Sequence, residues 1–372
     1  MISKIFLSIL FLGTFFCSAK AQFLNDRDSH QFVIDGLDAI YNQEFDKASK
    51  TLQRVYEKYS GHPVSYLLKA TNLFWRYQPI EANPAKAKEY LGLLEQCKRE
   101  AEKLVKIEKY KAEATFYLLS SHGFIARVHH HNHDYIKAGL EAKAAYSFLK
   151  DGFDLVEQNP DFLFTNGMYL FYREQYPETH PQIKPIIYFF KGGSKANGLI
   201  ALNQAGQKAL FSKVEAKNYL GGIYLKYENR NTEALRIYQS LVQKYPKNPD
   251  FYLRYVQSLV ANNELAGAQK AVEKLRLFSG TDQKLGYLLF KGLIADKSGD
   301  FKTAEGFYEK VLLFKANGGH TDDFVSMAKL GSGRIKLANG NKSEAEELLE
   351  DALAMAEYNW VRSEAKKLLD EL

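Results

Sequence analysis

The chain of 372 residues carries 50 Lys and Arg against 44 Asp and Glu, which gives a formal net charge of +6 at pH 7. This balance is mild, and no Lys/Arg-rich block of the kind that follows a phosphate backbone occurs, so the composition argues against nucleic-acid binding. Two cysteines exclude a disulfide-rich scaffold, and a chain of this length can bury a large apolar core without one.

The N-terminal residues have the three parts of a secretory signal peptide. Lys4 supplies the positive start, residues 5–16 form a nearly unbroken apolar run, and an Ala-Lys-Ala sequence ending at Ala21 supplies the small residues of a cleavage site. The apolar run is too short for a membrane-spanning helix, which needs about 20 such residues. We therefore expect cleavage after Ala21, which removes residues 1–21. The mature chain would be exported to the periplasm or cell envelope and would carry no transmembrane segment.

A lipoprotein signal is the alternative for this segment, because Cys17 lies in the zone where a lipidated cysteine would stand. The residues before it, Thr14-Phe15-Phe16, include two large side chains where a lipoprotein signal has small ones, so we favour the ordinary signal peptide. Cleavage would leave Cys97 as the only cysteine, and no intramolecular disulfide could then form.

Residues 22–160 contain the first units of a repeated helical pattern. Gly36 precedes Ala48 by twelve residues, and large or apolar residues follow four and seven positions after the Ala, on the same face of a helix. Less regular copies are centred on Ala87 and Ala138. The spacing between these early units exceeds that of the later ones, which predicts long helices in this part of the chain.

Four of the nine histidines fall between His129 and His133. If a helix continued through this stretch, His129 and His133 would share one face and, with Asp134, could bind Zn²⁺, Cu²⁺ or Ni²⁺. We favour a polar turn between two helices, because Asn132 stands where Asn-rich turns stand in the other units. No glutamate lies between spaced histidines as in H-E-x-x-H, so hydrolase chemistry has no support.

Residues 161–212 form a divergent central motif, whose first part, 161–176, is predicted as an extra helix. The sequence Gly192-Gly193-Ser194 then precedes a helix that carries Gly198. We favour a turn in which Ser194 caps this helix. The alternative is an anion held by the backbone N–H groups at the helix start, although the invariant Lys-Ser/Thr pair of a P-loop is missing.

Residues 213–372 repeat the pattern most clearly. Gly again precedes Ala by twelve residues at three places, namely Gly222 and Ala234, Gly292 and Ala304, and Gly333 and Ala345. Turn-forming Asn, Gly, Asp and Pro residues separate the apolar segments. The end of the chain is predicted as a last second helix and a polar capping helix, with a break near Asn359.

This pattern resembles the tetratricopeptide repeat, whose period is about 34 residues and whose two helices carry small residues where they cross. The resemblance implies an all-α, right-handed superhelical solenoid of seven to eight antiparallel helix pairs. The small residues of its second helices are Ala48, Ala87, Ala138, Gly198, Ala234, Ala268, Ala304 and Ala345. The central motif is similar to a segment of a wider family of divergent tetratricopeptide proteins that includes exported bacterial members, and that family implies no catalytic residues.

In such solenoids the first helices line a concave groove that takes an extended peptide or a partner's helix. Their positions within the repeat pattern place seven residues of the first helices in this groove: Tyr219, Ile223, Lys226, Tyr227, Asp250, Leu253 and Gln257. We therefore expect an exported scaffold that binds a protein or peptide partner and uses no cofactor. A small-ligand module of the cell envelope, for a glycan or a metal, is the alternative. Catalysis is not expected, because no acid–base or nucleophile constellation is assembled.

Overall fold

The computed structural model describes residues 22–188, 190–315 and 320–372, and these residues form helices and turns with no β-strand. The predicted signal peptide, residues 1–21, lies outside them. None of the described helices is both long and apolar enough to cross a membrane.

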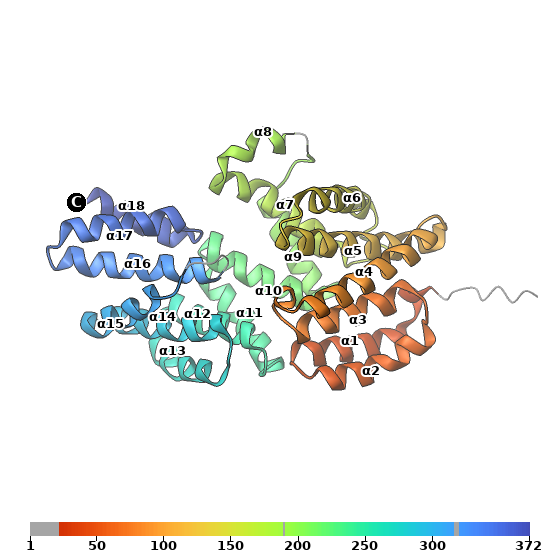
Figure 1. Ribbon diagram of the computed structural model, residues 1–372, viewed down its shortest axis with the longest axis horizontal. Coiled ribbons are helices and arrows are strands. Elements are labelled where there is room, and N and C mark those ends of the chain that lie inside the picture. The colour runs from red at the N-terminus through yellow and green to blue at the C-terminus, as the bar shows by residue number, and fades with distance from the viewer. Residues whose placement is uncertain (1–21, 189, 316–319) are drawn as a thin grey trace, which may run out of the picture.

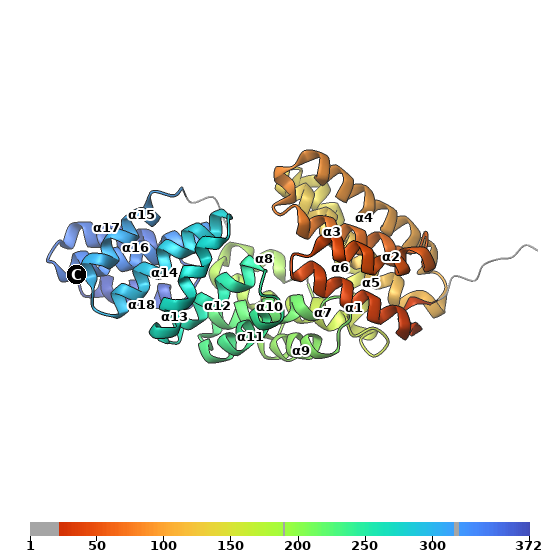
Figure 2. The ribbon, with the colours of Figure 1, turned by 90° about the horizontal axis from the view of Figure 1, so that it is seen from below.

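Eight helix pairs follow one another along the described chain (Figures 1 and 2). In the first half they are α1 (Arg27–Tyr41) with α2 (Phe45–Lys58), α3 (Pro63–Arg76) with α4 (Pro84–Leu104), α5 (Lys111–His131) with α6 (Tyr135–Asp154), and α7 (Phe162–Thr179) with α9 (Lys195–Lys208). In the second half they are α10 (Lys213–Ile223) with α11 (Asn231–Lys244), α12 (Pro249–Ala261) with α13 (Leu265–Val272), α14 (Thr281–Lys297) with α15 (Phe301–Leu312), and α16 (His320–Ala338) with α17 (Lys342–Met355). The short α8 (Lys184–Ile187) lies between α7 and α9, and α18 (Asn359–Asp370) ends the array.

The all-helical solenoid predicted from the repeat pattern is confirmed. Each of the eight small residues that marked a second helix lies in the second helix of a pair, and the chain breaks between α17 and α18 next to Asn359. The helix predicted over 161–176 exists as α7, but it is not an extra helix. It packs on α9 as the first helix of the fourth pair.

Close crossing of the two helices explains the small residues. Ala48, Ala304 and Ala345 have no exposed surface. A Cβ atom added to Gly36 would lie 2.5 Å from Leu52, the residue four positions after the Ala. The same addition at Gly292 would lie 2.8 Å from Tyr308, and at Gly333 it would lie 2.9 Å from Leu349. Larger side chains at these glycines would force the helices of each pair apart.

The fifth pair departs from this frame by one residue. Tyr224–Glu228 form a five-residue π-turn that continues α10, and the extra residue shifts the glycine that meets α11. A Cβ atom at Gly221 would lie 2.7 Å from the Tyr238 ring, whereas one at Gly222 would lie no closer than 3.6 Å. The crossing glycine of this pair is therefore Gly221 and not the Gly222 that the spacing predicted.

The central motif joins the two halves of the array through a buried carboxylate at the start of α7. Asp161 is 1% exposed and accepts hydrogen bonds from the backbone N–H groups of Leu210, Phe211 and Ser212, at 2.8 to 3.1 Å, and from the Ser212 hydroxyl at 2.7 Å. Burial raises the pKa of Asp161 in spite of these bonds. The loop before α10 is therefore fixed to the start of the preceding pair.

The start of α9 is also closed by the chain itself. Ser194 caps the helix by accepting from the backbone N–H of Asn197 at 3.2 Å, and its own N–H donates to the Leu170 carbonyl at 3.0 Å. The N–H of Lys195 donates to the Glu174 carboxylate at 2.8 Å. Three N–H groups at this helix start are thus already paired within the chain, and Ser194 caps the helix as predicted.

The array curls so far that its first pair meets the turn between α11 and α12 (Figure 1). The Tyr245 hydroxyl donates to Asp38 of α1 at 2.6 Å, and the side-chain amide of Asn248 donates to the Tyr41 carbonyl at 2.8 Å. Lys244 forms an ion pair with the same Asp38 at 2.8 Å. A solenoid whose repeats touch only their neighbours lacks such contacts. These contacts tie the first pair to the fifth and sixth pairs.

Candidate binding site on the inner face

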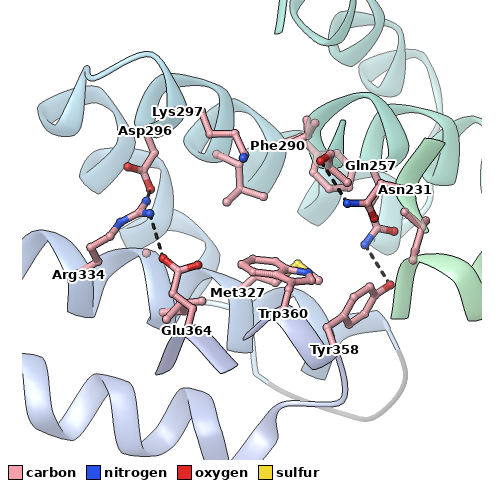
Figure 3. Close-up of a pocket in the computed structure, with 16 residues that line it drawn as sticks. Asn231, Gln257, Phe290, Asp296, Lys297, Met327, Arg334, Tyr358, Trp360 and Glu364 are labelled. Carbon is pink, nitrogen blue, oxygen red and sulfur yellow. Dashed lines mark hydrogen bonds and ion pairs between the residues drawn. The ribbon is translucent and has the colours of Figure 1, made fainter. Parts of the chain in front are cut away.

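The first helices of the last four pairs, α10, α12, α14 and α16, together form the inner face of the C-terminal half. A cavity of about 230 Å³ lies on this face, covered by the segment between α17 and α18 and by the start of α18 (Figure 3). Its apolar walls include Leu225, Val260, Leu293, Met327 and Trp360. Three first helices (α12, α14 and α16), the π-turn that continues α10, the start of α11 and the C-terminal helix therefore line one space.

One end of the cavity is polar and held by an ion-pair network (Figure 3). Arg334 of α16 bridges Asp296 of α14 and Glu364 of α18, with 3.1 Å between its Nη1 and the Glu364 carboxylate. Asp296 also accepts from the Tyr308 hydroxyl at 2.7 Å. Burial opposes the charge on Arg334, but the neighbouring carboxylates outweigh it and raise the pKa of the guanidinium.

At the other end, Tyr358 projects into the inner face and is 2% exposed. Its hydroxyl oxygen accepts from Arg254 Nη1 at 2.6 Å and from the Gln257 amide at 3.0 Å. The preceding Glu357 lies 3.8 Å from Lys226 Nζ and accepts from the Tyr227 hydroxyl at 3.4 Å. The segment before α18 therefore contacts α12 and the π-turn after α10, which are far away in the sequence.

The charges around Arg254 hold neighbouring groups in fixed protonation states. Burial opposes the charge on Arg254, but Tyr358, Tyr238 and Asp323 outweigh it and raise the pKa of the guanidinium. His320 lies 2.9 Å from Arg254, and that positive charge, together with burial, lowers the pKa of the imidazole to about 2. His320 is therefore neutral at physiological pH and is suited to accept a hydrogen bond from Arg254 and not to transfer protons.

The inner face also carries three half-buried carboxylates, on α10, α12 and α14. Burial raises the pKa values of Glu215, Asp250 and Asp282, in the case of Glu215 to about 7. The Tyr41 hydroxyl of α1 donates to Glu215 at 3.4 Å, and Gln283 donates to Asp250 at 3.1 Å. Glu215 therefore lies where α1 approaches the inner face.

Four of the seven predicted groove residues remain open to solvent. Tyr219 is 43% exposed, and Lys226, Tyr227 and Asp250 are half-buried. They contact, in this order, Phe164 of α7, Asp323 of α16, Glu357 of the segment before α18 and Gln283 of α14.

The other three predicted groove residues are a correction, because they are buried. Ile223 is 1% exposed, Leu253 is fully buried and Gln257 is 5% exposed. Leu253 packs onto Gly286 of α14, so it holds neighbouring pairs together. Gln257 points toward the inner face, but Tyr358 covers it. The position of a residue in the repeat pattern predicts the face of the helix on which it lies, but it does not predict which other part of the chain packs over that face.

The histidine cluster lies at a turn. Helix α5 ends at His131, Asn132 follows, and His133 adopts a left-handed conformation with φ of 60°. His129 and His133 therefore do not share a helical face, which was the premise of the metal hypothesis. Asp134 caps α6 and pairs with Lys137 at 2.8 Å. Among the described residues, no group of three His, Cys, Asp or Glu side chains is placed to hold a metal ion.

The residues that organise the inner face were missed by sequence reasoning. Arg254 stands alone among apolar residues of α12, and Glu357, Tyr358 and Trp360 fall at the predicted helix break. A lone arginine within an apolar helical stretch signals a buried ion partner, because burying an unpaired charge is very unfavourable. Its partners are 66 to 104 residues away in the sequence, which the repeat frame does not connect.

The comparisons with known proteins agree with this architecture. Residues 225–289, which span the π-turn, α11, α12, α13 and part of α14, match the family model of the tetratricopeptide repeat. No curated protein matches the sequence. The chain therefore contains tetratricopeptide repeats at residues 225–289, and its array of helix pairs has the fold of a tetratricopeptide repeat protein.

Proposed function

We propose that this chain is an exported, non-catalytic scaffold that binds a protein partner through the inner face of its C-terminal half. The observation that carries the proposal is a curved face of first helices with a cavity of about 230 Å³ and four accessible residues, Tyr219, Lys226, Tyr227 and Asp250. Tetratricopeptide repeats use this face for peptides and partner helices.

Catalysis has little support from the same face. Its strongly perturbed groups already serve as partners within the fold, since Arg254 binds Tyr358 and His320, and Arg334 binds Asp296 and Glu364. No nucleophile lies beside a base there, which acid–base or covalent catalysis requires. At this cavity a small-ligand function is supported less than a protein-binding one, because its volume of about 230 Å³ is below the roughly 300–1,000 Å³ that ligand pockets usually enclose.

Photocrosslinking tests the proposed partner surface. A photoreactive phenylalanine analogue replaces Tyr219, which is 43% exposed on the inner face, in the full chain expressed in its own cells. The matched control places the same analogue at Phe301, which is 52% exposed on a second helix. We expect a defined protein adduct at position 219 and none at 301. Equal labelling at both positions, or none at 219, would contradict the proposal.

Export is the second part of the proposal and rests on the predicted signal peptide. Cleavage after Ala21 would leave Gln22 as the first residue, directly before Phe23, which is fully buried. The Phe23 ring lies 5.1 Å from His30 and 5.3 Å from Tyr59, so the processed end would be held in the core. N-terminal sequencing of the protein from the envelope fraction should begin at Gln22. Retention of Met1, or a lipid on Cys17, would refute export by this route.

A further inference from the structure

Residues 357–360, between α17 and the first turn of α18, occupy part of the inner face and are here called the C-terminal segment. The side chains that receive it, Lys226, Tyr227, Arg254 and Gln257, are here called the seat. Asn359 adds a hydrogen bond at 2.5 Å to the Tyr227 carbonyl, inside the π-turn. The C-terminal segment is thus held in the way in which such a groove would hold a peptide.

The contacts show a definite chemical preference. Lys226 and Arg254 present positive charge to the Glu357 carboxylate and the Tyr358 hydroxyl. Part of the Lys226 charge is already engaged by Asp323 at 3.3 Å, which leaves room for one acidic residue and not for several. The seat therefore suits an acidic residue followed by an aromatic residue with a hydrogen-bonding group.

The C-terminal segment fills the seat incompletely. The contacts of Glu357 are long, at 3.8 Å to Lys226 and 3.4 Å to Tyr227. A cavity of about 230 Å³ lies beside Tyr358 and Trp360, and the segment does not fill it. Its walls are mainly apolar, so another large apolar side chain would be accommodated there.

We propose that the seat is a docking site for a peptide segment of a partner protein in which an acidic residue precedes an aromatic residue, and that the C-terminal segment occupies this site in the absence of the partner. The inference rests on the proposed function, because it assumes that the inner face is the partner surface. The partner's aromatic residue takes the place of Tyr358, and a neighbouring apolar side chain enters the cavity. The intramolecular segment then acts as a competitor that sets a threshold for binding.

A peptide-binding assay with the full mature chain tests this site. The probe is a fluorescein-labelled peptide with the sequence Ala-Glu-Tyr-Asn-Trp-Val, copied from residues 356–361, and its matched control has Gln for Glu and Ala for Tyr. Tyr358→Phe removes the hydrogen bonds to Arg254 and Gln257 but keeps the ring, so it loosens the competitor. Fluorescence anisotropy should show about tenfold tighter peptide binding to this variant than to the wild type, since the competing segment loses its hydrogen bond to a charged group.

Further variants give independent readings. Glu357→Gln weakens only the contacts to Lys226 and Tyr227, so we expect about threefold tighter peptide binding and an unchanged fold by circular dichroism. Lys226→Met should weaken binding of the probe in the Tyr358→Phe background but not binding of the control peptide.

The outcomes separate this proposal from the proposed function. Absence of probe binding to both folded variants, or equal binding of the probe and the control peptide, would overturn the proposal. Dimerisation of Tyr358→Phe with no peptide binding would overturn it in favour of a second copy of this chain. Crosslinking at position 219 with no peptide binding would leave the scaffold function standing and remove only the acidic–aromatic site.

Discussion

Alanine at Gly221 and alanine at Gly222 have opposite expected effects on the stability of the fifth pair. In an exposed or roomy helical position, Gly→Ala stabilises by about 0.5–1 kcal/mol, because alanine loses less conformational entropy on folding. At Gly222 the nearest atom to an added Cβ is the Tyr238 hydroxyl at 3.6 Å, which is ordinary contact. We therefore expect Gly222→Ala to stabilise α10 by nearly this full amount.

At Gly221 the same methyl group would lie 2.7 Å from the Tyr238 ring. This ring cannot swing away freely, because it is 1% exposed and its hydroxyl donates to the Asn218 carbonyl at 2.8 Å. Overpacking of a dense site costs about 1–3 kcal/mol, which exceeds the gain in helix propensity. We expect Gly221→Ala to destabilise the pair by about 1 kcal/mol net.

Hydrogen exchange of the α10 and α11 amides, read by mass spectrometry, measures the local free energy of opening. This assay suits a repeat array better than a single melting temperature, because repeats need not unfold together. Protection should rise in Gly222→Ala and fall in Gly221→Ala. The reverse order would show that the twelve-residue frame continues through α10 and that the π-turn at Tyr224–Glu228 is wrong.

Three further perturbations test other parts of the chain. Ala234→Leu at the fully buried helix crossing should lower the free energy of unfolding by about 1–3 kcal/mol in chemical unfolding. Gln239→Leu on the exposed face of the same helix should change it by less than about 0.5 kcal/mol. Similar losses in the two variants would refute the placement of Ala234 at a helix crossing. Because the Glu215 pKa is raised by burial from 4.5 to about 7, stability should fall as pH rises through this window. Glu215→Gln should remove that slope and stabilise the protein at pH 8 by about 1–2 kcal/mol, and an unchanged slope would contradict this assignment. A chelator should leave the melting temperature unchanged. If a chelator lowered the melting temperature, if Zn²⁺ reversed this loss, and if the His129→Ala/His133→Ala variant showed no such loss, a structural metal at the histidine cluster would be established.

Packing within each pair was readable from the sequence because it depends on local spacing. Small residues such as Ala48 and Ala345 recur at fixed distances from large ones, and the structure buries each of them where two helices cross. Helix ends were equally local, since Asn83 and Asn248 cap helices that begin with proline. Such signals depend on residues a few positions apart, so they survive the divergence between repeats.

The sequence predicted which residues form the fifth helix pair, but it did not predict the register in which the two helices meet. Gly221 and Gly222 are identical in type, so only the π-turn decides which of them meets Tyr238. A π-turn adds one residue without a glycine, a proline or a change of composition to mark it. Its energetic support comes partly from Asn359, which is far away in the chain.

The accessibility of the inner face could not be predicted for the same reason. Gln257 has the spacing of a groove residue, but the chain itself covers it with Tyr358. The meeting of Asp38 with Tyr245 is likewise set by the accumulated curvature of three intervening pairs, which no single repeat encodes. Repeat patterns specify neighbours, and small rotations summed over many neighbours decide which distant surfaces touch.

The π-turn and the C-terminal segment are parts of one arrangement. The extra residue turns the end of α10 so that Lys226 and Tyr227 face the segment, while Gly221 keeps its contact with α11. Without the extra residue, the side chains after Gly221 would be rotated by about 100° around the helix axis, and both contacts to Glu357 would be lost. The departure from the repeat frame therefore lies where the inner face makes its most specific contacts, which is where π-turns in helices are often found.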